Sequence, residues 1–531
     1  MEESQDSHKN AFVLRARVAF MDWVAAHKLD LGLLIFSILA TLATCLHYIS
    51  TMQLWTRPGF PLDDSWIHIQ YARTIYEGVP WQYSPDVPST GSTSPLWSII
   101  LSSLFFLTDD PVYIIWGTYV IAIVLYAAST FVVGKITQDY AGQPIWSLMA
   151  MGGFVLVPGN TWLMLSGMEA PIFVILLVLA IFVLDKKDIK YDPILGIILG
   201  LAYLARPEGV ILVLVCVPVR FLLVVWHREL SWRRLGSFLL MGVISLTVVL
   251  PWILYCLNVT GYPLPDTFYV KVHLPTEAGV EAWNTWWWFW LRSWPFLWVA
   301  FGGGLVLALK GKPFPWLVAW SLTLLYRFTM PHYSLVNNSR YLIPARALFL
   351  VVAVTSTAFM MEWALSLKKY ADIKTSARRM TVIFIIGVLI VPMQPIYLHQ
   401  AQTFGNGVKN INDMQVTIGV WIEENTPEDS VLAICDAGAV RFFGNRAVID
   451  IIGLVTPDIV HGNMTTLETL QYMYDRGCDY IVFFDDWFWV FGSYLEGALT
   501  TLFRVDLDDN ITCGSDAMSV YHINWALTDI S

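Results

Sequence analysis

Apolar segments close to membrane length recur along this chain and restrict its fold more than any other feature. About eleven can be placed on the 531 residues, although several are shorter than the roughly 20 residues that a bilayer-spanning helix needs. They lie at 31–50, 111–133, 145–158, 170–184, 194–205, 209–226, 235–256, 286–309, 314–329, 342–363 and 380–398. Only 14% of the residues are charged, whereas soluble domains average about 25%. This pattern predicts a polytopic α-helical membrane protein and excludes an ordinary soluble enzyme, a disordered chain and a fibrous protein.

Lysine and arginine residues divide the loops into two sets. With the segment 1–30 placed in the cytoplasm, 18 of them fall on the cytoplasmic side and only five lie in the outer loops of the membrane part. The cytoplasmic ones lie in 1–30, at 135, and in 186–190, 228–234, 310–312 and 368–379. This bias sets the orientation, provided that the short apolar stretch 95–107 is an in-plane or re-entrant helix. We therefore expect a multi-pass plasma-membrane protein with a membrane module over 31–399 and a first outer loop over 51–110.

The C-terminal segment 400–531 differs in composition from the rest of the chain. It holds five lysines and arginines against 19 aspartates and glutamates, and such an acidic surface does not suit nucleic acid. Buried strands are predicted at 431–434 and 480–484, with helices at 412–425 and 465–477. We expect an extracytoplasmic α/β domain, in which a disulfide between Cys478 and Cys513 is one alternative for two of the six cysteines.

Three carboxylates in the outer loops are candidates for catalysis. Asp63 and Asp64 are adjacent in the first loop, and Glu169 lies where a later span enters the membrane. Paired carboxylates at a membrane surface can serve as a general base and as metal ligands. The alternative is structural: Asp63 would cap a helix that begins at Asp64, and Glu169 would be a first-turn acid favoured by the helix dipole.

Cations in the same loops are candidates for binding an anionic substrate. Arg206 either binds a phosphate or pairs with Glu208, two residues further on. Lys271 is either a phosphate ligand or an anchor at the membrane interface. Arg340 has a planar guanidinium that suits a phosphate, and it too could instead be an interface anchor. The remaining substrate-binding candidates in the outer loops are Arg73, His273 and His332.

The order of these motifs resembles the GT-C superfamily of membrane glycosyltransferases, which use polyprenyl-phosphate sugars. The similar segments are 63–64, 71–73, 77–78, 91–97, 166–169, 206–209, 261–271 and 340–344. The resemblance covers about residues 31–400, and its nearest branch includes the mycobacterial terminal arabinofuranosyltransferases. That superfamily has in-plane helices after its first span, which correspond here to 64–77 and 95–107. The segment 450–454 resembles the variable outer domains of the group less specifically.

The resemblance implies an inverting transfer of a sugar from a polyprenyl-phosphate donor to an acceptor hydroxyl on a glycan, lipid or protein. It assigns the general base to Asp63. Asp64 and Glu169 would position the acceptor or hold a divalent cation, Mg²⁺ or Mn²⁺. The cations Arg206, Lys271 and Arg340 would neutralise the phosphate.

One residue departs from the pattern of the family, because Asp266 stands where asparagine is expected. The alternative function is a non-enzymatic flippase or transporter of lipid-linked sugars. A carrier needs access from both membrane faces, and the predicted cytoplasmic loops offer few acids to match the outer set.

Overall fold

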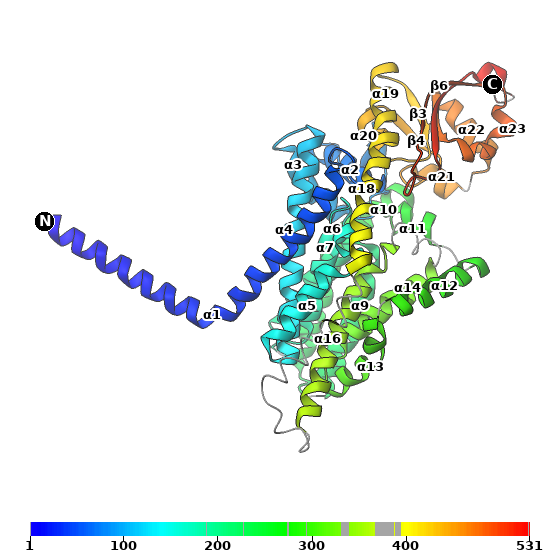
Figure 1. Cartoon of the computed structure of the whole chain (residues 1–531). Coiled ribbons are helices and arrows are strands. Elements are labelled where there is room, and N and C mark those ends of the chain that lie inside the picture. Colours follow the sequence, from blue (N-terminus) through cyan, green and yellow to red (C-terminus); the bar gives the residue numbers. More distant parts are fainter. Residues whose placement is uncertain are drawn as a thin grey trace.

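The computed structural model describes residues 2–186, 188–226, 228–272, 276–293, 295–330, 339–366, 387, 394–462, 464–528 and 530. Within these ranges most of the chain is helical, and the strands of the main sheet all belong to the C-terminal part. The predicted combination of a polytopic helical bundle with a C-terminal α/β domain is confirmed. In Figure 1 the bundle occupies the lower part of the molecule and the sheet lies at its upper end.

Helices occupy nearly all of the expected spans that fall in the described ranges. They are α1 (Glu2–Gln53), α4 (Pro111–Ala141), α5 (Pro144–Leu156), α7 (Ala170–Leu184), α8 (Tyr191–Ala205), α9 (Val210–Trp226), α10 (Trp232–Thr260), α12 (Glu277–Ser293), α13 (Pro295–Leu309), α14 (Phe314–Thr329) and α16 (Ile343–Ser366). Among the described residues, five helical stretches are long and apolar enough to cross a membrane: 26–53, 111–141, 207–225, 232–260 and 343–364. The other expected spans in the described ranges correspond to shorter helices.

Three expected boundaries do not coincide with the ends of described helices. Helix α1 runs through the expected cytoplasmic segment 1–30 into the first span, with one break in helical geometry at His27, and the location of 1–30 stays a prediction. The single span expected at 286–309 falls on two helices, α12 and α13. Most of the span expected at 380–398 lies outside the described residues, and α18 (Gln394–Ile411) passes residue 400 without a break.

The two helices expected to lie in the first outer loop are present. Helix α2 (Asp64–Tyr76) is largely buried. Helix α3 (Pro95–Phe105) begins where the Ser94 hydroxyl accepts a hydrogen bond from the Trp97 amide. Its 11 residues extend about 16 Å, roughly half the thickness of a bilayer core. The prediction that 95–107 does not cross the membrane is consistent with this length.

The C-terminal domain is built on a five-stranded sheet with the order β4-β3-β5-β7-β6. The strands are β3 (Val431–Ile434), β4 (Ala447–Asp450), β5 (Cys478–Phe484), β6 (Leu499–Asp506) and β7 (Ala517–Ile523). Strand β3 pairs in parallel with β4 and β5, and β7 pairs antiparallel with β5 and β6. Helices α19 (Thr417–Asn425) and α22 (Thr466–Asp475) lie close to the expected positions. The Cys478 and Cys513 thiols are not paired with each other.

Loops that were assigned to the cytoplasm lie together at one end of the bundle. Lys186 binds Asp139 at 2.7 Å and Lys312 binds Asp185 at 3.0 Å, so three separate loops meet there. The outer-loop candidates meet at the opposite end, as the next section describes. The structure thus supports the division into two sets, while the choice of the outer face stays a prediction.

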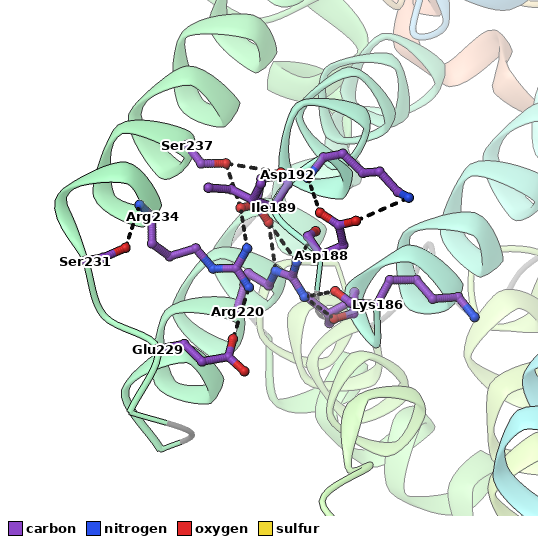
Figure 2. Close-up of polar contacts among 11 residues, drawn as sticks. Lys186, Asp188, Ile189, Asp192, Arg220, Glu229, Ser231, Arg234 and Ser237 are labelled. Carbon is purple, nitrogen blue, oxygen red and sulfur yellow. Dashed lines mark hydrogen bonds and ion pairs between the residues drawn. The ribbon is translucent and has the colours of Figure 1, made fainter.

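A buried ionic cluster fastens α8, α9 and α10 at the first of these ends (Figure 2). The fully buried Asp192 carboxylate lies 2.9 Å from Arg220 and 3.4 Å from Arg234, and it accepts a hydrogen bond from Ser237 at 2.7 Å. Arg220 also donates to the Leu184 carbonyl at 3.0 Å, at the end of α7. The cluster joins four helices. Because each buried charge has a partner of opposite sign, their attraction offsets much of the desolvation cost of burying them.

Candidate active site

A cavity lies where α2, the outer loops of the bundle and the C-terminal domain meet. Its charged lining residues come from separate outer loops: Asp64, His68, Glu169, Arg206, Glu208 and Lys271. Apolar side chains of the helix ends form much of the remaining wall. The cavity therefore brings together carboxylates and cations that the sequence predicted to share one membrane face.

Asp64 is the acid of the first loop that lines this cavity. Its carboxylate lies 2.5 Å from the Arg340 guanidinium and 3.7 Å from the Lys271 ammonium. Burial alone would raise the pKa of Asp64, but these two cations hold it well below the ordinary value. Asp64 is thus ionised, and both predicted phosphate ligands are within reach of the same oxygen.

Glu169 forms a second ionic group on the cavity wall. It is 3% exposed, and its two oxygens lie 2.8 Å from Arg206 Nε and 3.2 Å from His68 Nε2. Burial favours the neutral acid, but Arg206 and His68 together lower the pKa of Glu169 to about 2. The expected pairing of Arg206 with Glu208 is secondary, because that distance is 3.9 Å. Glu169 also occupies the N-cap position of α7 without a side-chain capping bond.

Asp63 points elsewhere and holds the C-terminal domain. Its two oxygens accept hydrogen bonds from the backbone amides of Gly438 and Ala439, both at 2.7 Å, where α20 (Ala439–Gly444) begins. It makes no side-chain cap on α2, which was its structural alternative. Burial and the charge of Asp436 raise the pKa of Asp63. Asp63 is absent from the cavity lining, so its position does not favour the role of general base.

The other predicted residues lie around the site or outside the described ranges. Arg73 donates to the Phe442 carbonyl at 3.0 Å and stacks over the Phe442 ring, so it contacts the C-terminal domain and not the cavity. Asp266, the departure from the family pattern, binds His461 of that domain at 2.9 Å. His273 and His332 lie outside the described residues.

Sequence reasoning missed several residues of the site. His68 lies four residues after Asp64, a spacing that puts both on one helix face, and this signal was available. Tyr341 follows Arg340 and lines the cavity. Leu454 lines it from the C-terminal domain, and no local pattern indicates that contact.

The arrangement does not fit the expected divalent cation. Among the described residues, no group of three histidine, cysteine, aspartate or glutamate side chains is placed to hold a metal ion. The two acids proposed as ligands, Asp64 and Glu169, are each neutralised by cationic side chains. A cation at either carboxylate would meet the repulsion of a neighbouring arginine.

Comparison with known proteins places the chain in a structural class. Residues 409–524 match a family model described as a domain of unknown function (DUF8728). No curated protein matches the chain. Among solved structures, ArnT from Cupriavidus metallidurans bound to undecaprenyl phosphate has a TM-score of 0.57 at 11% identity, over 91% of this chain and 97% of that one. Its apo state has a TM-score of 0.55 over the same shares.

A second solved structure of similar fold is the archaeal oligosaccharyltransferase AglB from Archaeoglobus fulgidus, in complex with an inhibitory peptide and a dolichol-phosphate. Its TM-score is 0.57 at 14% identity, over 91% of this chain and 73% of that one. The likeness shows that the chain shares the fold of ArnT and AglB. At these identities the likeness concerns the fold and does not distinguish one branch of the superfamily from another.

Proposed function

We propose that the chain is an inverting membrane glycosyltransferase that moves a sugar from a polyprenyl-phosphate donor to an acceptor hydroxyl. The observation that carries this proposal is the cavity, which is lined by Asp64, Glu169, Arg206 and Lys271, with Arg340 bound to the Asp64 carboxylate. Solved structures of this fold bind undecaprenyl phosphate or a dolichol-phosphate, which supports a lipid-phosphate ligand here.

The cations are proposed to bind the donor phosphate. Lys271 and Arg340 converge on one oxygen of Asp64. A phosphate oxygen in that place would therefore contact the Lys271 ammonium and the Arg340 guanidinium together. Charge develops on the phosphate as it leaves, and fixed cations in a partly buried site stabilise that charge strongly.

The general base is proposed to be Asp64. A phosphate that binds Lys271 and Arg340 would compete with Asp64 for them, and the pKa of the released carboxylate would rise toward its ordinary range, which improves it as a base. Asp64 would then take the acceptor proton while the acceptor oxygen bonds to the anomeric carbon. The bond from that carbon to phosphate breaks with its electron pair leaving on phosphate, so the configuration inverts.

Glu169 is proposed to position Arg206 and His68. Its carboxylate bridges the two side chains, and His68 Nδ1 has no hydrogen-bond partner among the described residues. His68 lines the cavity, and we propose that its ring nitrogen binds an acceptor hydroxyl. The sequence resemblance to the arabinofuranosyltransferase branch supports an envelope glycan or glycolipid acceptor on the outer face of the plasma membrane.

The test is mass spectrometry of envelope glycans and glycolipids from cells with and without the gene. The proposal predicts that one class of glycan lacks a sugar in the deletion strain. Wild-type protein should restore that sugar, and Asp64→Asn should not. Glycans that lack the sugar while the lipid-linked donor is retained on the cytoplasmic face would favour the flippase instead.

A further inference from the structure

One loop of the C-terminal domain forms part of the cavity wall. Leu454, which follows β4, is the cavity-lining residue that this domain contributes among the described residues. Every other described lining residue belongs to the membrane module. The domain is therefore a structural component of the site, and we asked what this one loop contributes.

The loop 451–455 is held in a fixed conformation by Asp450. This fully buried carboxylate accepts hydrogen bonds from the backbone amides of Ile452 at 2.9 Å and Val455 at 3.1 Å. Gly453 has a φ of +86°, in the left-handed region that favours glycine. These contacts fix the backbone on both sides of Leu454, so its side chain is presented to the cavity by a rigid support.

The same loop is pressed against the first outer loop. Ser89 donates a hydrogen bond to the Val455 carbonyl at 2.9 Å. A Cβ atom at Gly91 would lie 2.3 Å from the Leu454 carbonyl oxygen, so only glycine permits this approach. Gly91 and Thr93 also line the cavity, and together with Leu454 they form one continuous wall.

Other parts of the cavity lining belong to membrane helices. Val210 of α9 and Leu325 of α14, near the ends of their helices, line the cavity. The C-terminal domain contributes Leu454 to the same cavity. A polyprenyl chain must remain in the bilayer, so the substrate that meets Leu454 is the acceptor.

We propose that the loop 451–455 is the acceptor-binding wall and that Leu454 limits the size of the hydroxylated acceptor admitted beside Asp64. The proposal rests on the glycosyltransferase function above. It assigns to the C-terminal domain a part in acceptor selection, while donor binding stays with the membrane module. Leu454 is a specificity-determining residue in this account.

The experiment compares Leu454→Trp and Leu454→Ala with wild type in full-length protein. Donor binding is measured by thermal stabilisation with undecaprenyl phosphate, which also shows that each variant is folded. Transfer is measured from polyprenyl-phosphate sugars of a membrane extract to alkyl glycosides of one to three sugars. Ile452→Trp is the matched control, because Ile452 lies on the same loop, is 37% exposed and does not line the cavity.

We expect Leu454→Trp to lower kcat/KM for the larger acceptors by about tenfold or more, with undecaprenyl phosphate binding unchanged, and Leu454→Ala to extend the range of acceptors. If wild type transfers sugar normally and both Leu454 variants have unchanged acceptor kinetics, the role of Leu454 is overturned while the proposed function stands. Equal loss in the Ile452→Trp control would also overturn it. A wild-type protein that neither binds the lipid phosphate nor transfers sugar would overturn the proposed function and this inference with it.

Discussion

The Asp63 carboxylate accepts a hydrogen bond from the Gly438 amide at 2.7 Å, across a separation of 375 residues in the sequence. This contact joins the first outer loop to the C-terminal domain directly beside the cavity. The acid to which the sequence resemblance assigns the role of general base is thus bound to the C-terminal domain in this structure. The neighbouring acid, Asp64, takes the position at the cavity instead.

Replacement of Gly438 by alanine should disturb this docking. A Cβ atom there would lie 2.0 Å from the Asp63 carbonyl oxygen, and overpacking of this kind costs about 1–3 kcal/mol. We expect a lower melting temperature and faster proteolysis between the two parts of the chain. Gly236→Ala is the control, because a Cβ atom at Gly236 would meet nothing within 4 Å. Equal melting temperatures for the two variants would show that the contact does not hold the domain.

Lys271→Ala should weaken donor binding with little effect on folding. Lys271 is partly exposed and its nearest acid, Asp64, keeps Arg340 as a partner. A hydrogen bond to a charged group is worth about 1.5–3 kcal/mol, so the donor KM should rise by roughly tenfold or more. Arg57→Ala removes an exposed cation of the same outer loops and should leave the donor KM unchanged. Equal effects of both variants would indicate a general loss of surface charge.

Asp436 should make stability depend on pH near neutrality. Burial, with the charges of Asp64 and Asp450, raises its pKa to about 7 from an ordinary 3.8. Between these values the native state binds more protons than the unfolded state, so the free energy of unfolding falls as pH rises. The melting temperature of wild type should therefore decrease more between about pH 5.5 and 8 than the melting temperature of Asp436→Asn. The exposed Asp429→Asn should behave as wild type, and identical slopes for Asp436→Asn would contradict the assignment.

The helical architecture and the common location of the outer-loop residues could be predicted because hydropathy and charge are local properties. Glu169, Arg206 and Lys271 each lie next to an apolar segment, so a shared end of the bundle is where they must meet. His68 could also have been predicted, since it is one helical turn from Asp64. The expected span 286–309 joined parts of α12 and α13 because the aromatic second half of α12 and the apolar α13 have similar hydropathy.

The contribution of the C-terminal domain could not be predicted from local patterns. The contacts of Asp63 with Gly438, of Gly91 with Leu454 and of Asp266 with His461 depend on how two separately patterned parts fit together. The roles of Asp63 and Asp64 illustrate the consequence. Their sequence environments are nearly identical, and only the docked domain distinguishes the acid that supports the interface from the acid that lines the cavity.

The orientation in the membrane can be tested with single cysteines. The charge bias predicts that the C-terminal domain is outside, so Asp475→Cys, at an exposed position, should react with a membrane-impermeant reagent in intact cells. Asp188→Cys, exposed at the other end of the bundle, should react only after permeabilisation. Both are made in a Cys513→Ser background, because Cys513 is partly exposed. The reverse pattern would invert the topology and move the site to the cytoplasmic face.

The central claim is that Asp64 at this cavity drives cleavage of a polyprenyl-phosphate sugar. The most direct measurement is acceptor-dependent release of polyprenyl phosphate by purified protein in lipid nanodiscs, with wild type, Asp64→Asn and Asp63→Asn compared. The account predicts release by wild type with inversion at the anomeric carbon, a loss of about 10²–10⁴-fold in kcat for Asp64→Asn, and a smaller loss for Asp63→Asn that accompanies a lower melting temperature. Near-normal release by folded Asp64→Asn, with Asp63→Asn inactive yet as stable as wild type, would contradict it.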